Sequence, residues 1–600
     1  MKLTIAFSMH ATICSSRGNI MKVALIGAEL EESMALRYMA SSLEHEGHET
    51  EIVPFNSRAE IPHVVETIKK INPQIAALSM VFTGRAPEFC NLAQSLRDAG
   101  YRGHIVAGGH FASFNYEKLL KTFPAFDSVG LGEGELLLCK LAQSLNALAD
   151  VPGLAFRDAD GTVKCSPGIK QEDLDALPFP KRSNFHEYFG KRIAGILSSR
   201  GCWRNCAFCS INAWYEHQGG KKFRYRSIAN IVEEMKQLYF NYGIRVFNFH
   251  DDNFFLGDKQ QALERFKNLR DELKKNGIEQ IAIAIKARPD SITRESISIL
   301  DELGVFRVFL GVENASENAL RNLNRRQTVE DILNALQILN DFDIHVAYNY
   351  LLFELDTTMD DILINLRFME RHLENPFNFC RAEAYAGTGL EEKLRSQGRL
   401  LGDYFGFDYR IKDPKVEKFH EIANYAFFDR NFNDDGLHYF NMQIDFFFQI
   451  LRRFHPDYLS QSLRATVRNF IKETNLDTFE CLSHLYDFVM DVDVNDEPKI
   501  QRFAKEMRQR IDKRSAVLLA KGERIIGYFE KAYRNKGLDP QFIFNSEDNS
   551  ISTINTSTVV AASDASDFLQ IQNTSEILNL LATGRNFLPY DEFQKKLKNQ

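Results

Sequence analysis

Short apolar strands alternate with amphipathic helices over the first 150 residues, and this alternation restricts the fold more than any other feature of the sequence. Nearly all-apolar strands indicate a parallel sheet that is covered on both faces. Residues 21–150 therefore predict a doubly wound, Rossmann-like α/β domain, whose ligands should lie beyond the carboxyl ends of the strands. We expect strands at 21–27, 48–55, 74–80, 104–109 and 126–132, and helices at 33–46, 61–71, 87–99, 114–122 and 134–147.

A second series of strands and helices follows a linker, residues 151–190, that contains the proline-rich run ALPFPKR (176–182). Six strand–helix units over residues 191–400 predict a partial (β/α)6 barrel of the TIM type. In such a barrel the chemistry is expected on the loops that follow the strands. We expect these strands at 193–199, 245–250, 280–285, 305–312, 345–353 and 377–385.

The pattern becomes purely helical after residue 400. Residues 401–544 predict an α-helical domain, 545–566 a flexible linker rich in Ser, Thr, Asn and Asp, and 567–600 a short helical tail. The aromatic stretch 419–450 is typical of a packed helix pair. Residues 1–20 are interpreted as an extension rather than an export signal, because Ser8 and His10 interrupt the only apolar run.

Composition narrows the class of protein. The net charge of −8 gives no support for nucleic-acid binding, and no apolar run reaches the roughly 20 residues of a membrane span. Six of the nine cysteines are scattered, which is unlike a disulfide framework and indicates a reducing compartment, the cytoplasm. These six are Cys14, Cys90, Cys139, Cys165, Cys380 and Cys481.

The other three cysteines, Cys202, Cys206 and Cys209, crowd onto the loop after strand 193–199. Structural zinc sites use four ligands, usually from paired C-x2-C units, and no second pair is present. Three cysteines without a partner instead suit a [4Fe–4S] cluster with one iron open to a small-molecule ligand. A zinc knuckle or three unrelated thiols is the structural alternative.

A C-x3-C-x2-C loop after the first strand of a (β/α)6 barrel resembles the radical S-adenosylmethionine (SAM) superfamily. The resemblance implies that SAM chelates the open iron, and that one-electron reduction by a flavodoxin- or ferredoxin-type partner cleaves it to a 5′-deoxyadenosyl radical. Phe208 stands where the family has an aromatic residue before the third cysteine.

Further barrel strand ends carry residues that match the family's SAM contacts. The resemblance assigns Asp251 and Asp252 to the SAM amine, Arg288 to its carboxylate, Glu313 to the ribose and Tyr385 to the adenine. For each of these residues, the alternative is a salt bridge or a helix cap in a loop.

The first domain resembles the cobalamin-binding domain of the corrinoid branch of this superfamily. The matching runs are SMVFTGRAPE (79–88), VAGGHFAS (106–113) and VGLGEGE (129–135). The resemblance makes Ser79, Thr83, Gly108 and Gly109 the cobalamin contacts, although a glycine pair is also common in a plain tight turn.

One departure from the cobalamin pattern concerns the ligand below cobalt. Met34 stands where mutase-type domains carry the lower-ligand histidine, and Arg37 replaces the glycine of that motif. Either cobalamin binds here without a protein histidine, or it does not bind.

The sequence thus predicts a cobalamin-dependent radical SAM methyltransferase acting on an unactivated carbon of a small-molecule or peptide substrate. A non-methylating cyclase or rearrangement enzyme of the same branch is the alternative. A methylthiotransferase would need three further clustered cysteines in the first domain, and an electron carrier would need a fourth cysteine ligand. Cys380, within a predicted strand, suits core packing better than hydrogen-atom donation.

Overall fold

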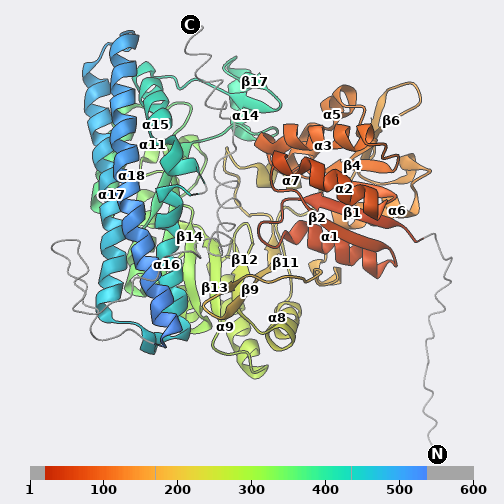
Figure 1. The fold of residues 1–600 in the computed structure, drawn as a ribbon, viewed down its shortest axis with the longest axis horizontal. Coiled ribbons are helices and arrows are strands. Elements are labelled where there is room, and N and C mark those ends of the chain that lie inside the picture. Colours follow the sequence, from red (N-terminus) through yellow and green to blue (C-terminus); the bar gives the residue numbers. More distant parts are fainter. Residues whose placement is uncertain (1–19, 169, 434, 537–600) are drawn as a thin grey trace, which may run out of the picture.

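The structure is a computed structural model that describes residues 20–168, 170–433 and 435–536. An α/β domain, an open α/β barrel and a helical domain follow one another along the chain (Figure 1). Apart from residue 20, the predicted extension (1–20), flexible linker (545–566) and tail (567–600) lie outside the described residues. No helix in the described ranges is long and apolar enough to cross a membrane.

The first domain has the predicted doubly wound architecture, because the strands of its parallel core are buried on both faces. Alternate residues of the first strand enter two separate cores: Ala24 and Ile26 pack on one side, Val23 and Leu25 on the other. The sheet order is β2-β1-β3-β4-β5-β6-β7. The parallel strands are β1 Lys22–Gly27, β2 Glu49–Pro54, β3 Ile75–Ser79, β4 His104–Gly108 and β5 Ser128–Gly130, and the helices are α1 Met34–His45, α2 Ile61–Ile71, α3 Ala86–Asp98, α4 His110–Phe114, α5 Tyr116–Thr122 and α6 Gly134–Gln143.

The segment predicted as a linker, 151–190, also completes this first sheet. Strands β6 (Leu154–Arg157) and β7 (Val163–Cys165) add to β5 in antiparallel pairing. These strands are only four and three residues long and have no clear alternation of apolar and polar residues, so the sequence pattern gave no sign of them. Only the later part of the segment connects the two domains.

The second domain is an open barrel in which six parallel strands form one curved sheet, with β8 added antiparallel at one edge. Its order is β16-β15-β14-β13-β12-β9-β8. Its strands are β8 Glu187–Tyr188, β9 Lys191–Ile196, β12 Ile244–Phe249, β13 Ala282–Ala287, β14 Val305–Leu310, β15 His345–Phe353 and β16 Phe377–Arg381, and a separate pair is formed by β10 Ser199–Arg200 and β11 Arg224–Tyr225.

The helices of the barrel begin where the sequence offers side-chain caps. Thr293, Thr328 and Thr358 each start a helix with a reciprocal capping box, which satisfies main-chain N–H groups in the first turn. The helices are α7 Ser210–His217, α8 Ile228–Tyr242, α9 Lys259–Lys275, α10 Arg294–Leu303, α11 Glu317–Asn322, α12 Val329–Asp341, α13 Met359–Arg371 and α14 Gly389–Ser396.

The helical domain closes one end of the barrel. Its helix α16 contacts β14, β15 and β16, and Phe446 of α16 lies 5.2 Å from Phe306 and 5.5 Å from Tyr188, ring centre to ring centre. These contacts lie at the amino ends of the barrel strands, so the carboxyl ends stay free to form a site. The domain comprises α15 Pro414–Phe432, α16 Leu437–Phe454, α17 Gln461–Asp491 and α18 Glu497–Arg534.

The start of the segment predicted to be helical, residues 401–408, instead forms a small β-hairpin that packs against the first domain. It consists of β17 (Leu401–Asp403) and β18 (Gly406–Asp408). The ring of Phe405 at its turn lies 5.7 Å from that of Phe111 and 5.8 Å from that of Phe123. Because both partners belong to the first domain, the hairpin holds that domain from the carboxyl-terminal half of the chain.

Candidate functional site

The three predicted cluster cysteines, Cys202, Cys206 and Cys209, share one loop that enters from β10 and leaves into α7. Gly201 precedes them with φ of 84°, a left-handed conformation. A Cβ atom at Gly201 would lie 1.9 Å from the main-chain oxygen of Lys222, so only glycine fits. The loop is therefore shaped by a specific backbone requirement directly before the first cysteine.

The middle of the loop is attached to two other parts of the barrel. The main-chain N–H of Ala207 donates to the carbonyl of Leu323 (2.9 Å), and its carbonyl accepts from the N–H of Leu390 (2.8 Å). Phe208, the predicted aromatic residue of the loop, is half-buried against the barrel core. These contacts fix the loop at the carboxyl ends of the strands, where the sequence placed it.

Two guanidinium groups face the sulfur of Cys206, which is buried. Arg288 donates from Nη1 to Sγ at 3.6 Å, and Arg325 donates from Nη1 to the same atom at 3.2 Å. Burial raises the pKa of the Cys202 and Cys209 thiols above the usual range. A bound metal cluster and these cations are what would stabilise the thiolate forms.

The donor set suits an iron–sulfur cluster better than a single ion. Within the described ranges, no three His, Cys, Asp or Glu side chains are placed to share one metal ion. A four-iron cluster instead takes each thiolate on a different iron, and hydrogen bonds to its sulfurs are a usual part of such sites. The three cysteines and the two arginines fit that group.

The two predicted aspartates have different surroundings. Asp251 is fully buried and accepts hydrogen bonds from Ser198 N (3.0 Å), Ser198 Oγ (3.0 Å) and Ser199 Oγ (2.5 Å). Asp252 accepts one hydrogen bond, from the N–H of Gly201 at 3.0 Å, and lines the main cavity. Burial raises the pKa of Asp252 to about 6. Asp252 is thus the carboxylate left available for a ligand cation.

Arg288 and Glu313 lie on the same side of the barrel mouth, linked through Arg325. The side chain of Arg288 is buried beside Cys206, and Glu313 Oε1 lies 3.5 Å from Arg325 Nη2. Burial raises the pKa of Glu313, and its backbone is left-handed, with φ of 63°. Tyr385 is half-buried after β16, where its carbonyl accepts from the Thr388 hydroxyl (2.7 Å).

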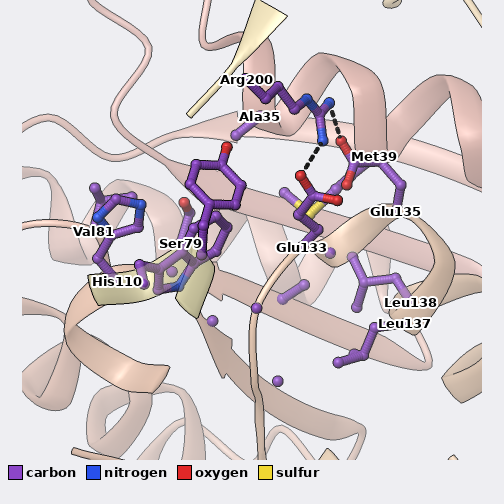
Figure 2. Close-up of a pocket in the computed structure, with 18 of the residues that line it drawn as sticks. Ala35, Met39, Ser79, Val81, His110, Glu133, Glu135, Leu137, Leu138 and Arg200 are labelled. Atoms are coloured by element: carbon purple, nitrogen blue, oxygen red, sulfur yellow. Dashed lines mark hydrogen bonds and ion pairs between the residues drawn. The ribbon is translucent and has the colours of Figure 1, made fainter. Parts of the chain in front are cut away.

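A cavity of about 290 Å³ lies between the carboxyl ends of the first sheet and the barrel mouth (Figure 2). From the first domain it is lined by three of the predicted cobalamin contacts, Ser79, Gly108 and Gly109. The fourth, Thr83, opens the 3₁₀ turn Thr83–Arg85 and is not among the lining residues.

The glycines of this wall leave room for a large group. A Cβ atom at Gly108 would meet no protein atom within 4 Å, so a side chain there would project into the open space. At Gly109, which has φ of 95°, a Cβ atom would instead lie 2.9 Å from the Met80 carbonyl oxygen. The open space beside Gly108, at a strand end, fits a bulky cofactor such as cobalamin.

The two residues that depart from the cobalamin pattern have structural roles. Met34 is buried in a small core with Tyr38, Leu174 and Leu177. Arg37 is buried in an ion pair with Glu29. The residues at these two positions therefore pack the domain and do not offer an imidazole to a corrinoid.

The opposite wall of the cavity comes from the barrel domain, and apart from Asp252 its residues were not predicted as site residues from the sequence. It includes Arg200, Trp214, Tyr215 and His250, together with Asp252. The indole of Trp214 stacks on the imidazole of His110 with ring centres 4.4 Å apart. Beside them, Arg200 pairs with Glu133 (3.1 Å) and Glu135 (2.6 Å), as Figure 2 shows.

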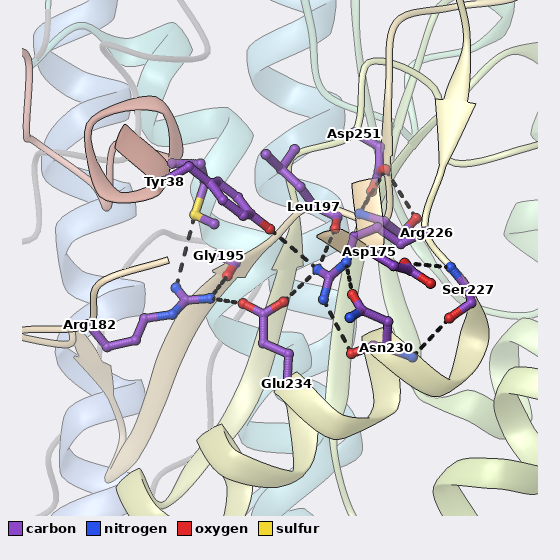
Figure 3. Close-up of polar contacts among 12 residues, drawn as sticks. Tyr38, Asp175, Arg182, Gly195, Leu197, Arg226, Ser227, Asn230, Glu234 and Asp251 are labelled. Atoms are coloured by element: carbon purple, nitrogen blue, oxygen red, sulfur yellow. Dashed lines mark hydrogen bonds and ion pairs between the residues drawn. The ribbon is translucent and has the colours of Figure 1, made fainter. Parts of the chain in front are cut away.

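A buried ion network fixes the two domains against each other next to this cavity (Figure 3). Arg182 pairs with Glu32 of the first domain (3.0 Å) and Glu234 of α8 (2.6 Å). Glu234 also pairs with Arg226 (2.5 Å), whose Nη1 donates to the hydroxyl of Tyr38 (3.4 Å). All these side chains are nearly inaccessible to solvent. The network therefore holds the two walls of the cavity in a fixed position relative to each other.

Two family models match the chain. Residues 26–142 match the B12 binding domain, and residues 196–364 match the radical SAM superfamily. These spans coincide with the first domain and with most of the barrel.

Individual relatives match at low identity. An uncharacterized methyltransferase, PH0819 of Pyrococcus horikoshii, is 26% identical over 379 residues, 61% of this chain and 79% of its own length. The anaerobic magnesium-protoporphyrin IX monomethyl ester cyclase of Synechocystis is 27% identical over 275 residues, 44% of this chain and 52% of its own length.

Two solved structures share the fold. The cobalamin-dependent S-adenosylmethionine radical enzyme OxsB with aqua-cobalamin bound covers 86% of this chain and 84% of its own, with a TM-score of 0.61 and 15% identity. The radical S-adenosylmethionine methyltransferase TsrM of Kitasatospora setae covers 63% of this chain and 76% of its own, with a TM-score of 0.53 and 18% identity.

Proposed function

Because the chain carries a radical SAM domain and a B12 binding domain, we propose that it is a cobalamin-dependent radical SAM methyltransferase. Its substrate would be a small molecule or peptide with an unactivated carbon. Support comes from the relative named as a methyltransferase and from the likeness to the folds of OxsB and TsrM.

The observation that carries this proposal is the shared cavity. Ser79 and Gly108 line it from the B12 binding domain, and Asp252 lines it from the radical SAM domain. Asp252 also accepts a hydrogen bond from Gly201, which directly precedes the cysteine loop. A methyl carrier and a radical source must act on the same carbon atom, and residues that we propose as contacts of each line this cavity.

When bound, the cluster and cobalamin would supply reductive cleavage of SAM to a 5′-deoxyadenosyl radical and a carrier for the methyl group. Cys202, Cys206 and Cys209 would hold the cluster. Asp252 would accept the SAM ammonium, whereas Asp251 orients the strand ends around it.

The remaining predicted contacts would orient the two cofactors. Arg288 would face the SAM carboxylate, Glu313 the ribose hydroxyls and Tyr385 the adenine. Ser79, Gly108 and Gly109 would support cobalamin. Thr83, which does not line the cavity, would reach cobalamin only from the start of the turn Thr83–Arg85.

A non-methylating cyclase or rearrangement enzyme is the less favoured alternative, although one relative is named as a cyclase. Either chemistry needs a one-electron donor, for which we propose a flavodoxin- or ferredoxin-type protein. The isolated cysteines of the chain are consistent with work in a reducing cytoplasm.

The test is anaerobic purification with iron, sulfide and corrinoid measured on the same sample. The protein is then incubated with SAM, a reductant and a small-molecule extract. A methyltransferase forms 5′-deoxyadenosine and S-adenosylhomocysteine together, with label from methyl-labelled SAM in a product. Formation of 5′-deoxyadenosine without S-adenosylhomocysteine would favour the cyclase class. If neither product is formed, the proposal of a radical SAM enzyme is refuted.

A further inference from the structure

Two cationic side chains lie on the concave face of the barrel sheet, deeper than the cysteine loop. Ala284 of β13 pairs in register with Arg307 of β14, and Lys286 lies two residues further along β13. Paired residues of parallel strands share a face, and so do residues i and i+2. Ala284 packs with the core of α16, so all three face the barrel interior above that helix.

Arg307 is buried without a polar partner. Its side chain is 5% exposed, and its Nε and Nη2 atoms have no hydrogen-bond acceptor in the described parts of the chain. Its guanidinium lies over the ring of Phe446, 5.4 Å from the centre, which fixes its position but does not satisfy its N–H groups. A buried donor without an acceptor destabilises the folded protein, and more so when the donor is charged.

Every other arginine that is buried in the described residues has at least one hydrogen bond or ion pair, which sets Arg307 apart. Arg182 pairs with Glu32 and Glu234, and Arg430 bonds to the carboxylate of Asp477 (2.6 Å) and the hydroxyl of Ser515 (2.8 Å). A purely structural arginine is satisfied in that way. The free donors of Arg307 instead suit a ligand that supplies oxygen acceptors.

Lys286, which lies nearer the mouth of the barrel, is a second cation without a polar partner among the described residues. It is half-buried and has no hydrogen bond or ion pair with any described residue. Burial lowers its pKa, while Asp252, Asp251 and Glu31 act in the opposite direction. Asp251 already accepts hydrogen bonds from Ser198 and Ser199, and in the proposed function Asp252 serves the SAM ammonium.

The remaining acid, Glu31, reaches the barrel from the β1–α1 loop of the first domain. Arg307 and Lys286 both act on it, yet no ion pair joins Glu31 to either cation in the described structure. Burial raises the pKa of Glu31 to about 8, which favours its uncharged form. Neither Arg307 nor Lys286 therefore has an ion-pair partner among the described residues.

We propose that Arg307 and Lys286 bind an anionic group of the substrate, a carboxylate or a phosphate, inside the barrel. This inference rests on the proposed function, because it takes the interior of the barrel as the substrate site. The reacting carbon of such a substrate would lie toward the carboxyl ends of the strands, between the anion site and the cavity of Figure 2.

The experiment is calorimetric titration of the full reconstituted chain, with SAM present and under anaerobic conditions. Three probes of similar size are compared: phenyl phosphate, benzoate and the neutral benzyl alcohol. We expect one of the two anions to bind at least about tenfold more tightly than benzyl alcohol, since a charge-assisted pair contributes roughly 1.5–3 kcal/mol. Preference for phenyl phosphate or for benzoate identifies the anion as phosphate or carboxylate.

Variants separate a binding role from a structural one. Arg307→Met and Lys286→Met should each weaken the preferred anion about tenfold or more, and Arg307→Lys should restore part of the loss. Arg192→Met is the matched control, because Arg192 lies at the exposed start of β9, donates to the carbonyl of Tyr242 (3.1 Å) and approaches Glu187 only to 3.8 Å. Thermal unfolding checks that each variant is folded, and Lys286→Met, at a less buried position than Arg307, provides the test if Arg307→Met does not fold.

Two results would overturn the inference: equal binding of all three probes, or unchanged anion binding in both Met variants. Wild-type SAM cleavage is measured on the same sample. Loss of cleavage with intact anion preference would refute the proposed function and leave the anion site standing, whereas cleavage without anion preference would refute only the anion site.

Discussion

The Sγ atom of Cys206 accepts two charged hydrogen bonds, from Arg288 and Arg325. These hydrogen bonds would affect the reduction potential of a cluster bound to that sulfur. Arg325 follows α11 and is separated from Cys206 by 119 residues. Its Nη2 also donates to the carbonyl of Gly311 (2.6 Å), so its position is fixed independently of a cluster. Hydrogen bonds to cluster sulfurs are one of the main determinants of reduction potential.

Replacing Arg325 by Met should lower the reduction potential of the cluster. The N–H donors stabilise the more negative, reduced state, and a charged hydrogen bond of about 1.5–3 kcal/mol corresponds to roughly 60–120 mV for one electron. The measurement is a redox titration followed by electron paramagnetic resonance. Arg326→Met, at the exposed neighbouring position, is the control, and an unchanged potential in the Arg325 variant would contradict the assignment.

Asp252 predicts a pH dependence of SAM binding. Burial raises its pKa to about 6, and only the ionised carboxylate attracts an ammonium group. SAM affinity should therefore rise as the pH rises from 5 to 7, with a change of about tenfold per unit below pH 6. Equilibrium dialysis of the anaerobic protein measures this directly. An affinity that is flat over this range would argue against a charge contact at Asp252.

The same residue predicts a stability effect of opposite sign. A carboxyl whose pKa is raised on folding stabilises the fold only while protonated, and this contribution is lost as the pH rises from about 4 through 6. Asp252→Asn should thus bind SAM more weakly at pH 7 yet unfold at a higher temperature. Its free energy of unfolding should rise by up to about 3 kcal/mol. Weaker binding together with lower stability would instead indicate a structural role.

At the scale of elements, the site lies where the carboxyl ends of the parallel strands of the two domains face each other. The connection is made by the second half of the segment 151–190, where Arg182 bridges Glu32 and Glu234. A buried pair of this kind is costly to break, because the carboxylates left behind lose their counter-charge.

Arg182→Met should lower the free energy of unfolding by about 3–5 kcal/mol. The measurement is the midpoint of denaturant unfolding, compared with that of Arg192→Met. Because Arg192 and Glu187 are about half exposed, breaking that pair should change stability by less than about 1 kcal/mol. Equal effects of the two substitutions would show that the network of Figure 3 does not hold the domains together.

At the scale of the whole molecule, the cavity exists because two domains meet. The B12 binding domain supplies Gly108 and Gly109 to its lining, and the barrel domain supplies Trp214. Cofactor binding should therefore depend on residues outside the B12 binding domain.

Trp214→Ala should reduce the corrinoid bound per chain, because Trp214 forms the opposite wall and stacks on His110. Loss of a buried aromatic contact of about 1.5–3 kcal/mol corresponds to roughly a tenfold weaker affinity or more. Absorbance of the bound corrinoid after gel filtration measures the effect. Phe240→Ala, at a 58% exposed position, serves as the control, and full corrinoid retention by Trp214→Ala would contradict a shared site.

The sequence by itself determined the two α/β domains, the helical domain after them and the cysteine loop at a strand end. Strand–helix alternation is a local, periodic signal, and parallel topology brings the carboxyl ends of strands to one edge whatever the details of packing. For this reason, the sequence alone was enough to predict that Cys202, Cys206 and Cys209 lie at the same edge as Asp252 and Arg288.

Only the tertiary structure decided which of these side chains are available and what faces them. Asp251 and Asp252 are adjacent in sequence, yet one is saturated by serines and the other lines the cavity. Arg307, Arg325 and Trp214 had no motif to mark them, because their partners come from distant segments. Contacts of this kind depend on how elements pack, and no local pattern in the sequence encodes them.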